Sequence, residues 1–140
     1  MKRGWNGSET KSYRETISLG ENLSYYLETG DVIGLTGDLA SGKTTFIKGL
    51  LSGLKFEGMV NSPTFTLINE YNASPKIIHI DCYREHDLKR WVQLGIFEYF
   101  SSNDIVLIEW PDIIKSILPD CIEYIEFRNI DKNKRRITTV

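Results

Sequence analysis

The chain has 140 residues, with 17 basic and 19 acidic side chains and a formal net charge of −2 at pH 7. This length predicts one domain around a single hydrophobic core. The nearly balanced charge gives no overall field that would draw the chain onto nucleic acid or a membrane. Because no stretch is apolar for long enough to cross a bilayer and the first residues are polar, the sequence predicts a cytosolic protein without a membrane partner.

The N-terminal part is polar and then becomes apolar. Residues 1–13 contain two glycines and few apolar side chains, which predicts a loosely ordered leader before a domain that spans residues 14–140. Thr16–Ser18 is predicted as a short strand and Glu21–Leu27 as a short helix. Val32–Thr36 is an apolar run typical of a buried parallel strand.

A phosphate-binding motif follows this strand. Gly37–Thr44 has the sequence Gly-Asp-Leu-Ala-Ser-Gly-Lys-Thr, which matches the Gly-x-x-x-x-Gly-Lys-Thr loop of P-loop nucleotide hydrolases. A helix is predicted at Thr44–Leu54, where apolar residues recur at helical spacing. In such a loop, glycines let backbone N–H groups turn toward a phosphate, and the helix N-terminus adds partial positive charge. Strand, loop and helix together predict a nucleotide site.

The residue types in the loop predict how a nucleotide is held. Lys43 is expected to reach the β- and γ-phosphates, and the Thr44 hydroxyl to coordinate Mg²⁺ between them. Thr45 is placed to contact the α-phosphate. The predicted nucleotide-binding residues are Asp38, Leu39, Ala40, Ser41, Gly42, Lys43, Thr44 and Thr45.

The second half of the chain contains further predicted elements. Apolar or alternating segments predict strands at Phe65–Tyr71, Lys76–Asp81, Asp104–Glu109, Cys121–Arg128 and Arg135–Val140. The last two are predicted to pair as a hairpin. Between the two middle strands, Leu88–Phe100 is predicted to be helical.

Two of these strands end in a carboxylate. Asp81 follows the largely apolar run Ile77–Ile80, and Glu109 follows the apolar run Ile105–Ile108. A nucleotide hydrolase needs an acid near Mg²⁺ and a group that orients the attacking water, and such acids lie at the C-terminal ends of sheet strands. Asp81 and Glu109 are therefore predicted as the catalytic and Mg²⁺-binding acids, and the division of these roles between them stays open.

Three other features have a structural and a functional interpretation. His79 lies in an apolar strand and is interpreted as a hydrogen-bonded residue of the core, or as one that supports a residue of the site, rather than as a general base. Lys134–Arg136 is interpreted as a solvated edge strand, with contact to tRNA phosphates as the alternative. Cys82 and Cys121 lack a Cys-x-x-Cys pattern and lie in apolar surroundings, which favours free buried thiols over a disulfide or metal site.

Several short motifs occur together in a defined order. They are Gly30-Asp31, Gly37-Asp38-Leu39, Ser62-Pro63-Thr64-Phe65, the segment His79–Arg84 and Ile108-Glu109-Trp110. Their order and spacing closely resemble the TsaE family, formerly called YjeE, small bacterial ATPases of the pathway that makes threonylcarbamoyladenosine in tRNA. The resemblance implies an α/β fold, a single P-loop NTPase domain with a mixed, largely parallel central sheet flanked by helices and a C-terminal β-hairpin.

The resemblance also implies an activity and partners. Family members bind ATP or ADP with Mg²⁺, associate with the TsaB and TsaD proteins, and hydrolyse ATP to support turnover of that complex, so contact with tRNA is expected to be only indirect. Ser62–Phe65 resembles a switch-like loop that senses the γ-phosphate, and Thr64 is its expected catalytic hydroxyl. Trp110 is expected beside the site. Tyr83 and Arg84 are expected on the adjoining surface, where Arg84 could contact a phosphate or a partner.

The chain departs from the family pattern at two positions. It has Ala40-Ser41 where the family usually has Gly-Ala, and Cys82 where the family usually has Leu. The Cβ of Ala40 is tolerable if the φ angle of that residue is negative. We therefore expect the departure in the loop to alter nucleotide affinity rather than abolish it, and Cys82 to affect nothing catalytic.

The sequence alone is also compatible with other functions of P-loop proteins. A small-molecule kinase normally needs a lid carrying arginines, and Leu88–Phe100 contains only Arg90. A GTP-binding switch normally carries Asn-Lys-x-Asp after an apolar strand; the sequence lacks this signature, which favours ATP. A nucleotide-binding adaptor without turnover stays an alternative because binding and hydrolysis need different residues.

Overall fold

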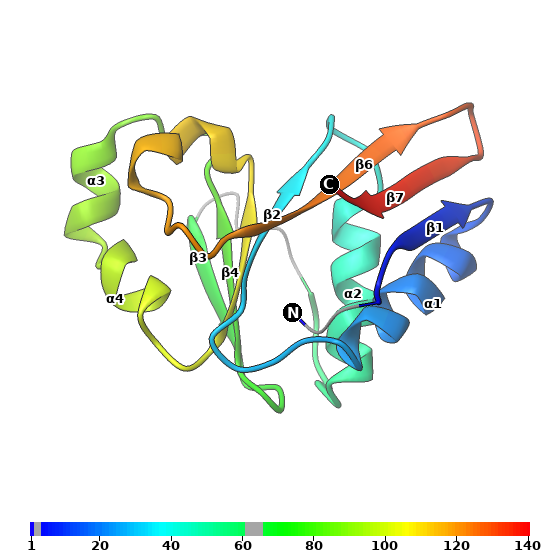
Figure 1. Ribbon diagram of the computed structural model, residues 1–140, viewed down its shortest axis with the longest axis horizontal. Coiled ribbons are helices and arrows are strands. Elements are labelled where there is room, and N and C mark those ends of the chain that lie inside the picture. Colours follow the sequence, from blue (N-terminus) through cyan, green and yellow to red (C-terminus); the bar gives the residue numbers. More distant parts are fainter. Residues whose placement is uncertain (2–3, 61–65) are drawn as a thin grey trace.

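A mixed sheet with helices on both faces forms the domain (Figure 1). The computed structural model describes residue 1, residues 4–60 and residues 66–140. Within these residues, the strands are β1 (Gly7–Thr10), β2 (Val32–Thr36), β3 (Ile68–Tyr71), β4 (Ile77–Asp81), β5 (Ile105–Glu109), β6 (Glu123–Asn129) and β7 (Arg135–Thr139). The helices are α1 (Tyr13–Ser24), α2 (Lys43–Gly53), α3 (Leu88–Gln93), α4 (Ile96–Phe100) and the 3₁₀ helix η1 (Pro111–Ile117).

The strand order is β1-β7-β6-β2-β5-β4-β3. The four central strands β6, β2, β5 and β4 run parallel, whereas β7, β1 and β3 pair antiparallel with their neighbours. The predicted α/β fold with a mixed sheet, flanking helices and a C-terminal hairpin is therefore confirmed. Parallel pairing is confined to the centre, because there helices cover both faces and the strands are apolar on both sides.

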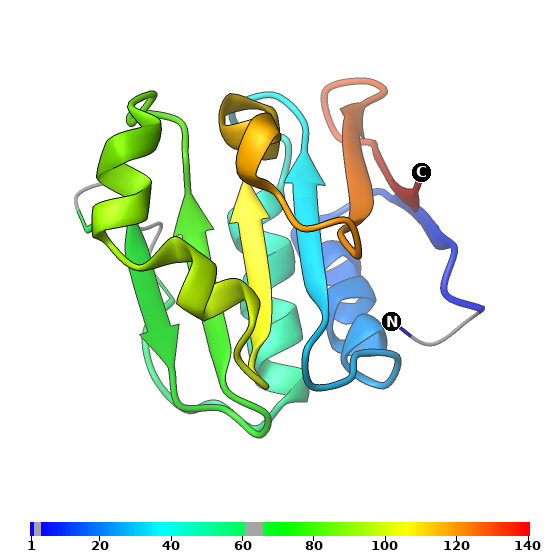
Figure 2. The ribbon, with the colours of Figure 1, turned by 60° about the vertical axis from the view of Figure 1, so that its left-hand side comes forward.

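Alternate residues of the central strands point to opposite faces of the sheet and build two hydrophobic clusters. Ile33, Leu107 and other side chains on one face pack with Phe46 and Leu50 of α2. The opposite face carries a second cluster, which includes Val32, Ile78, Ile80, Val106, Ile108, Trp91, Ile96 and Ile114. Figure 2 shows α1 and α2 behind the sheet and the helices α3, α4 and η1 in front of it.

The N-terminal segment is more ordered than the sequence predicts. Gly7–Thr10 pairs with β7, and the buried Trp5 ring lies 6.1 Å from the Phe46 ring. The loosely ordered leader predicted for residues 1–13 is therefore wrong over this strand. The segment Gly-Ser-Glu-Thr has almost no strand signal of its own, and only the open edge of β7 makes it a strand.

The strand predicted at Thr16–Ser18 is wrong, because this segment lies within the helix α1. The helix predicted at Glu21–Leu27 is confirmed only as far as Ser24, where α1 ends. Ser12 caps α1 by accepting a hydrogen bond from the backbone N–H of Glu15 at 3.1 Å. The helix then packs closely on α2. A Cβ at Gly49 of α2 would lie 2.1 Å from the Ile17 carbonyl oxygen, so this glycine lets α2 approach α1 closely.

The other elements lie close to their predicted positions, with two corrections. Leu88–Phe100 is broken at Gly95, whose φ angle of 81° separates α3 from α4. The hairpin of β6 and β7 is confirmed, but β7 lies between β6 and β1. The interpretation of Lys134–Arg136 as an edge strand is therefore wrong, and Lys134 and Arg136 form ion pairs with Glu9 of β1.

The two cysteines are free thiols in different environments. Cys82 is buried, and burial, with smaller contributions from Asp81 and Glu109, raises the pKa of its thiol to about 12. Cys121 is exposed, so the expectation that both thiols are buried is wrong for Cys121. In the part of the chain that the structure describes, no helix has the length and apolar character needed to cross a membrane.

Candidate nucleotide-binding site

The predicted P-loop connects β2 to α2 and has the backbone that its glycines require. Gly37 and Gly42 have φ angles of 143° and 97°. A Cβ at Gly37 would lie 2.6 Å from the Phe127 carbonyl oxygen, and a Cβ at Gly42 would lie 3.1 Å from Cδ of Arg135. A side chain at either position would therefore meet both backbone strain and neighbouring atoms.

The loop borders a cavity of about 410 Å³, within the range of about 300–1,000 Å³ typical of small-ligand sites. Besides the P-loop residues Leu39 to Thr45, the cavity is lined by Leu67, Asp81, Tyr83, Arg84, Glu109, Trp110 and Arg135. The structure thus brings the loop and both strand-end acids together. Of the predicted nucleotide-binding residues, Asp38 differs because it is exposed and lines a separate hollow with Glu126 and Arg128.

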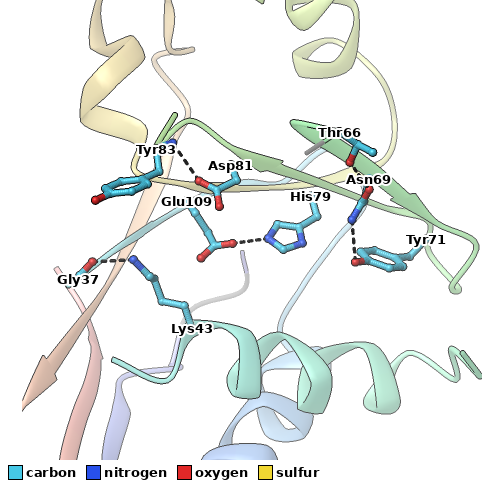
Figure 3. Close-up of polar contacts among 9 residues, drawn as sticks. All are labelled: Gly37, Lys43, Thr66, Asn69, Tyr71, His79, Asp81, Tyr83 and Glu109. Atoms are coloured by element: carbon cyan, nitrogen blue, oxygen red, sulfur yellow. Dashed lines mark hydrogen bonds and ion pairs between the residues drawn. The ribbon is translucent and has the colours of Figure 1, made fainter. Parts of the chain in front are cut away.

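Lys43 is held inside this cavity. Its Nζ donates a hydrogen bond to the Gly37 carbonyl oxygen at 2.6 Å (Figure 3). The same atom lies 4.4 Å from the centroid of the Trp110 ring. The residue is only 6% exposed. Burial lowers the pKa of Lys43, against the opposing effect of the negative charges of Glu109, Asp81 and Asp38. The ammonium group of Lys43 is therefore partly removed from water and lies near the carboxylates of the site, where it is placed to bind an anionic ligand in the cavity.

Asp81 and Glu109 lie side by side at one edge of the sheet. They are register partners at the ends of β4 and β5, and adjacent strands are about 4.8 Å apart. The expectation that both strands present their acids at the loop-bearing edge is confirmed. Asp81 Oδ1 accepts a hydrogen bond from the backbone N–H of Tyr83 at 3.0 Å. Glu109 is more buried, with 4% of its surface exposed.

His79 contacts one of these acids. Its Nε2 lies 2.6 Å from Glu109 Oε2 (Figure 3). The histidine has no exposed surface. The interpretation of His79 as a buried hydrogen-bonded residue is confirmed. The pairing of β4 with β5 explains why Glu109 is the partner. His79 is two residues before Asp81, which pairs with Glu109, so the side chains of His79 and Glu109 are diagonal neighbours on the same face of the sheet.

The donor groups suit a magnesium ion that is shared with a nucleotide. Among the described residues, no three His, Cys, Asp or Glu side chains form a metal-binding cluster. Thr44, Asp81 and Glu109 line the cavity and provide a hydroxyl and two carboxyl groups. Mg²⁺ prefers oxygen ligands and usually combines one or two carboxylates with water and substrate phosphates. The residues therefore fit a metal ion that is completed by phosphate oxygens.

Arg135 is a site residue that the sequence reasoning missed. It projects from β7 to the P-loop, where its Nη2 is 3.5 Å from the Ala40 carbonyl oxygen. Among the described residues, its buried Nε and the buried Ser41 Oγ have no hydrogen-bond partner. Unpaired donors beside a P-loop suit an anionic ligand. The alternation of side chains along a strand could have indicated this residue, because it places Arg135 on the opposite face of the sheet from Lys134 and Arg136.

Trp110 lies beside the site as expected. Its ring is 4.9 Å from the Tyr83 ring, and its backbone has a φ angle of 56°. This left-handed residue turns the chain from β5 into η1 and leaves the indole over Lys43. Arg84 is exposed and lines the cavity, on the adjoining surface as expected. The predicted loop Ser62–Phe65, with Thr64, lies outside the described residues.

The Cβ of Ala40 was expected to be tolerated if the φ angle of this residue were negative, and this condition is not met. Its φ angle is 60°, a left-handed value that costs a residue with a Cβ about 1 kcal/mol. We expect Ala40→Gly to leave stability unchanged or raise it slightly, because relief of this strain offsets the greater freedom of glycine in the unfolded chain. Nucleotide affinity should shift by less than about tenfold, since a 1 kcal/mol change in loop strain corresponds to about fivefold.

Ala73 is the matched control for this prediction. It is a half-buried loop alanine and is not among the residues with positive φ, so Ala73→Gly should destabilise the protein by about 0.5–1 kcal/mol. Thermal unfolding and calorimetric ADP titration measure both effects. Equal destabilisation by the two substitutions would contradict the assignment of strain to Ala40.

Comparison with known proteins gives consistent matches over most of the chain. The family model described as "Threonylcarbamoyl adenosine biosynthesis protein TsaE" matches residues 10–137. The tRNA threonylcarbamoyladenosine biosynthesis protein TsaE of Bacillus subtilis is 38% identical over 130 residues, 92% of this chain and 81% of that protein. The Treponema pallidum protein of the same name is 35% identical over 129 residues, 92% of this chain and 96% of the relative. The crystal structure of Bacillus subtilis YdiB superimposes with a TM-score of 0.81 at 33% identity, over 94% of this chain and 81% of that one.

Proposed function

The chain belongs to the TsaE family, and from this membership we propose that it is a Mg²⁺-dependent ATPase of tRNA threonylcarbamoyladenosine biosynthesis. It acts in the cytosol with the TsaB and TsaD proteins and hydrolyses ATP to ADP and phosphate, which supports turnover of their complex. One observation carries the proposal: a P-loop lysine and two register-paired carboxylates line the same cavity. Binding alone would need the loop, whereas hydrolysis also needs acids at the γ-phosphate.

Each wall of the cavity has a part in this reaction. The backbone N–H groups of the P-loop and the N-terminus of α2 bind the phosphates. Lys43 leaves the Gly37 carbonyl oxygen and binds the β- and γ-phosphate oxygens, neutralising the charge that develops during transfer. Thr44 and one strand-end acid would hold Mg²⁺, which supplies further charge neutralisation and fixes the phosphates in orientation.

The remaining acid orients the attacking water. The water oxygen forms a bond to the γ-phosphorus while the bond from that phosphorus to the β–γ bridging oxygen breaks. The products are ADP and inorganic phosphate, and the water proton passes to solvent or to a phosphate oxygen through the acid that holds the water. The rings of Trp110 and Tyr83 contact each other and line the cavity, and this apolar lining would limit the access of bulk water to the reacting atoms.

The proposal is tested by ATP hydrolysis with the pure protein, alone and with the cognate TsaB–TsaD pair, in the presence and absence of Mg²⁺. We expect slow turnover alone and at least about tenfold stimulation by the pair, because a partner can supply catalytic groups or order the site. Tight ATP binding without turnover under any of these conditions would overturn the proposal and favour an adaptor. Transfer of the phosphoryl group to a small acceptor would favour a kinase.

A further inference from the structure

The contact between His79 and Glu109 is unusual for its place in the fold. The two residues belong to neighbouring parallel strands that are otherwise largely apolar, and both side chains are buried, although Glu109 also lines the cavity. His79 shares a face of β4 with Ile77 in the core and with Asp81 at the cavity. It therefore occupies the last position between the hydrophobic core and the candidate site.

The hydrogen bond has a defined direction. An ionised carboxylate oxygen only accepts, so with Glu109 ionised Nε2 of His79 carries the hydrogen and donates the hydrogen bond to Glu109 Oε2. Among the described residues, Nδ1 of the same ring has no hydrogen-bond partner. The histidine thus makes its one side-chain hydrogen bond within the described chain to the acid of the site. An apolar side chain would fill the same space without a buried polar atom, so packing alone does not explain a histidine here.

The bond leaves the rest of the carboxylate available. With Oε2 held by His79, the second oxygen of Glu109 points to the side on which Lys43 lies (Figure 3). Glu109 has several rotatable bonds, and an unrestrained carboxylate would sample positions that do not face the phosphates. A short bond from a buried ring restricts it to one orientation, as the second ligand shell does in metal sites.

We propose that His79 is a positioning residue, which fixes the Glu109 carboxylate so that its free oxygen faces the γ-phosphate region of the cavity. The reaction part of this role rests on the proposed ATPase function. The neighbouring Tyr71 ring, 6.2 Å away and inclined by 32°, flanks the imidazole and limits its rotation. His79 contacts no substrate and acts only through Glu109.

The test compares three variants in the full-length protein. His79→Leu removes the donor, His79→Gln places an amide N–H near the position of Nε2, and Ile77→Val perturbs the same strand without touching Glu109. We expect His79→Leu to lower the turnover number at least about tenfold while the dissociation constant for ADP changes less than about threefold. His79→Gln should recover most of the turnover. Ile77→Val should have the same turnover number as the protein without substitutions.

Two results would overturn the proposal. One is unchanged turnover in His79→Leu. The other is an equal loss in His79→Leu and His79→Gln with no recovery by the amide, which would make His79 a packing residue only. Thermal unfolding of all three variants shows whether a loss of turnover follows a loss of folded protein.

A measurement on the unchanged protein covers the case in which the variants do not fold or the chain does not hydrolyse ATP. The sequence contains only two histidines, His79 and the exposed His86, so ¹⁵N NMR of the imidazole groups is simple to assign. We expect a slowly exchanging Nε2–H signal from His79 that shifts in Glu109→Ala. A proton on Nδ1 with a bare Nε2 would overturn the positioning bond. Absence of ATP hydrolysis together with the expected Nε2–H signal would instead reject the proposed function alone.

Discussion

Replacing Lys43 with alanine is expected to abolish ATP hydrolysis and to weaken nucleotide binding at least about 100-fold. The side chain is the ammonium group inside the cavity, it is almost fully buried, and it faces Glu109 and Asp81. Without it, the phosphates of a bound nucleotide would lie beside two carboxylates with no neutralising side chain on the P-loop. Calorimetric titration with ADP and a phosphate-release assay measure the two losses.

Lys48→Ala is the matched control because it removes the same charge from the same helix. Lys48 lines a separate hollow with Leu51 and Phe56 and does not line the P-loop cavity. It should leave turnover and ADP affinity within about twofold, as surface substitutions away from a site usually do. Normal turnover in Lys43→Ala would reject the cavity as the site of hydrolysis.

Replacing Glu109 with glutamine is expected to lower ATP turnover at least about 100-fold, the usual contribution of a positioned acid or base. Nucleotide binding should change much less, because the P-loop and Lys43 are left intact. The glutamine side chain keeps the shape of glutamate and can accept the hydrogen bond from His79, so the loss reports the missing charge. Single-turnover hydrolysis and ADP titration separate the two effects.

Glu98→Gln on α4 makes the same chemical change at an exposed residue and should leave turnover unaffected. Asp81→Asn provides the comparison within the site, and we expect it also to retain binding better than hydrolysis. The Mg²⁺ concentration needed for half-maximal turnover should rise in the variant that has lost a metal ligand, which assigns the two roles. If both acid variants hydrolysed ATP normally, the proposed mechanism would be wrong.

Much of the site could be predicted because its signals are local. Val32–Thr36, the glycine-rich loop and the helix after it are contiguous, so their conformation follows from residue type and spacing. The neighbouring positions of Asp81 and Glu109 could also be predicted. Parallel strands end at the same edge of a sheet, and a carboxylate directly after an apolar run marks that end.

The errors occur where a segment has no strong local preference. Gly7–Thr10 becomes a strand only because β7 has an edge to pair with, and Thr16–Ser18 becomes helical because Ser12 caps a helix that packs on α2. The condition on Ala40 failed for a related reason. Its φ angle depends on the path of the whole loop, which the identity of one residue does not determine.

The identity of the motif, the class of ligand and the two acids were therefore available from the printed sequence, because they depend on residue type and on spacing along a few turns of chain. Three contacts could not be predicted from the sequence. They are the contact of His79 with Glu109, the approach of Arg135 to the P-loop and the placement of Trp110 over Lys43. Each joins residues about 30 to 100 positions apart, so each depends on which strands pair and in which register. That choice is made by burial of the whole sheet between its two layers of helices, a property of the assembled fold.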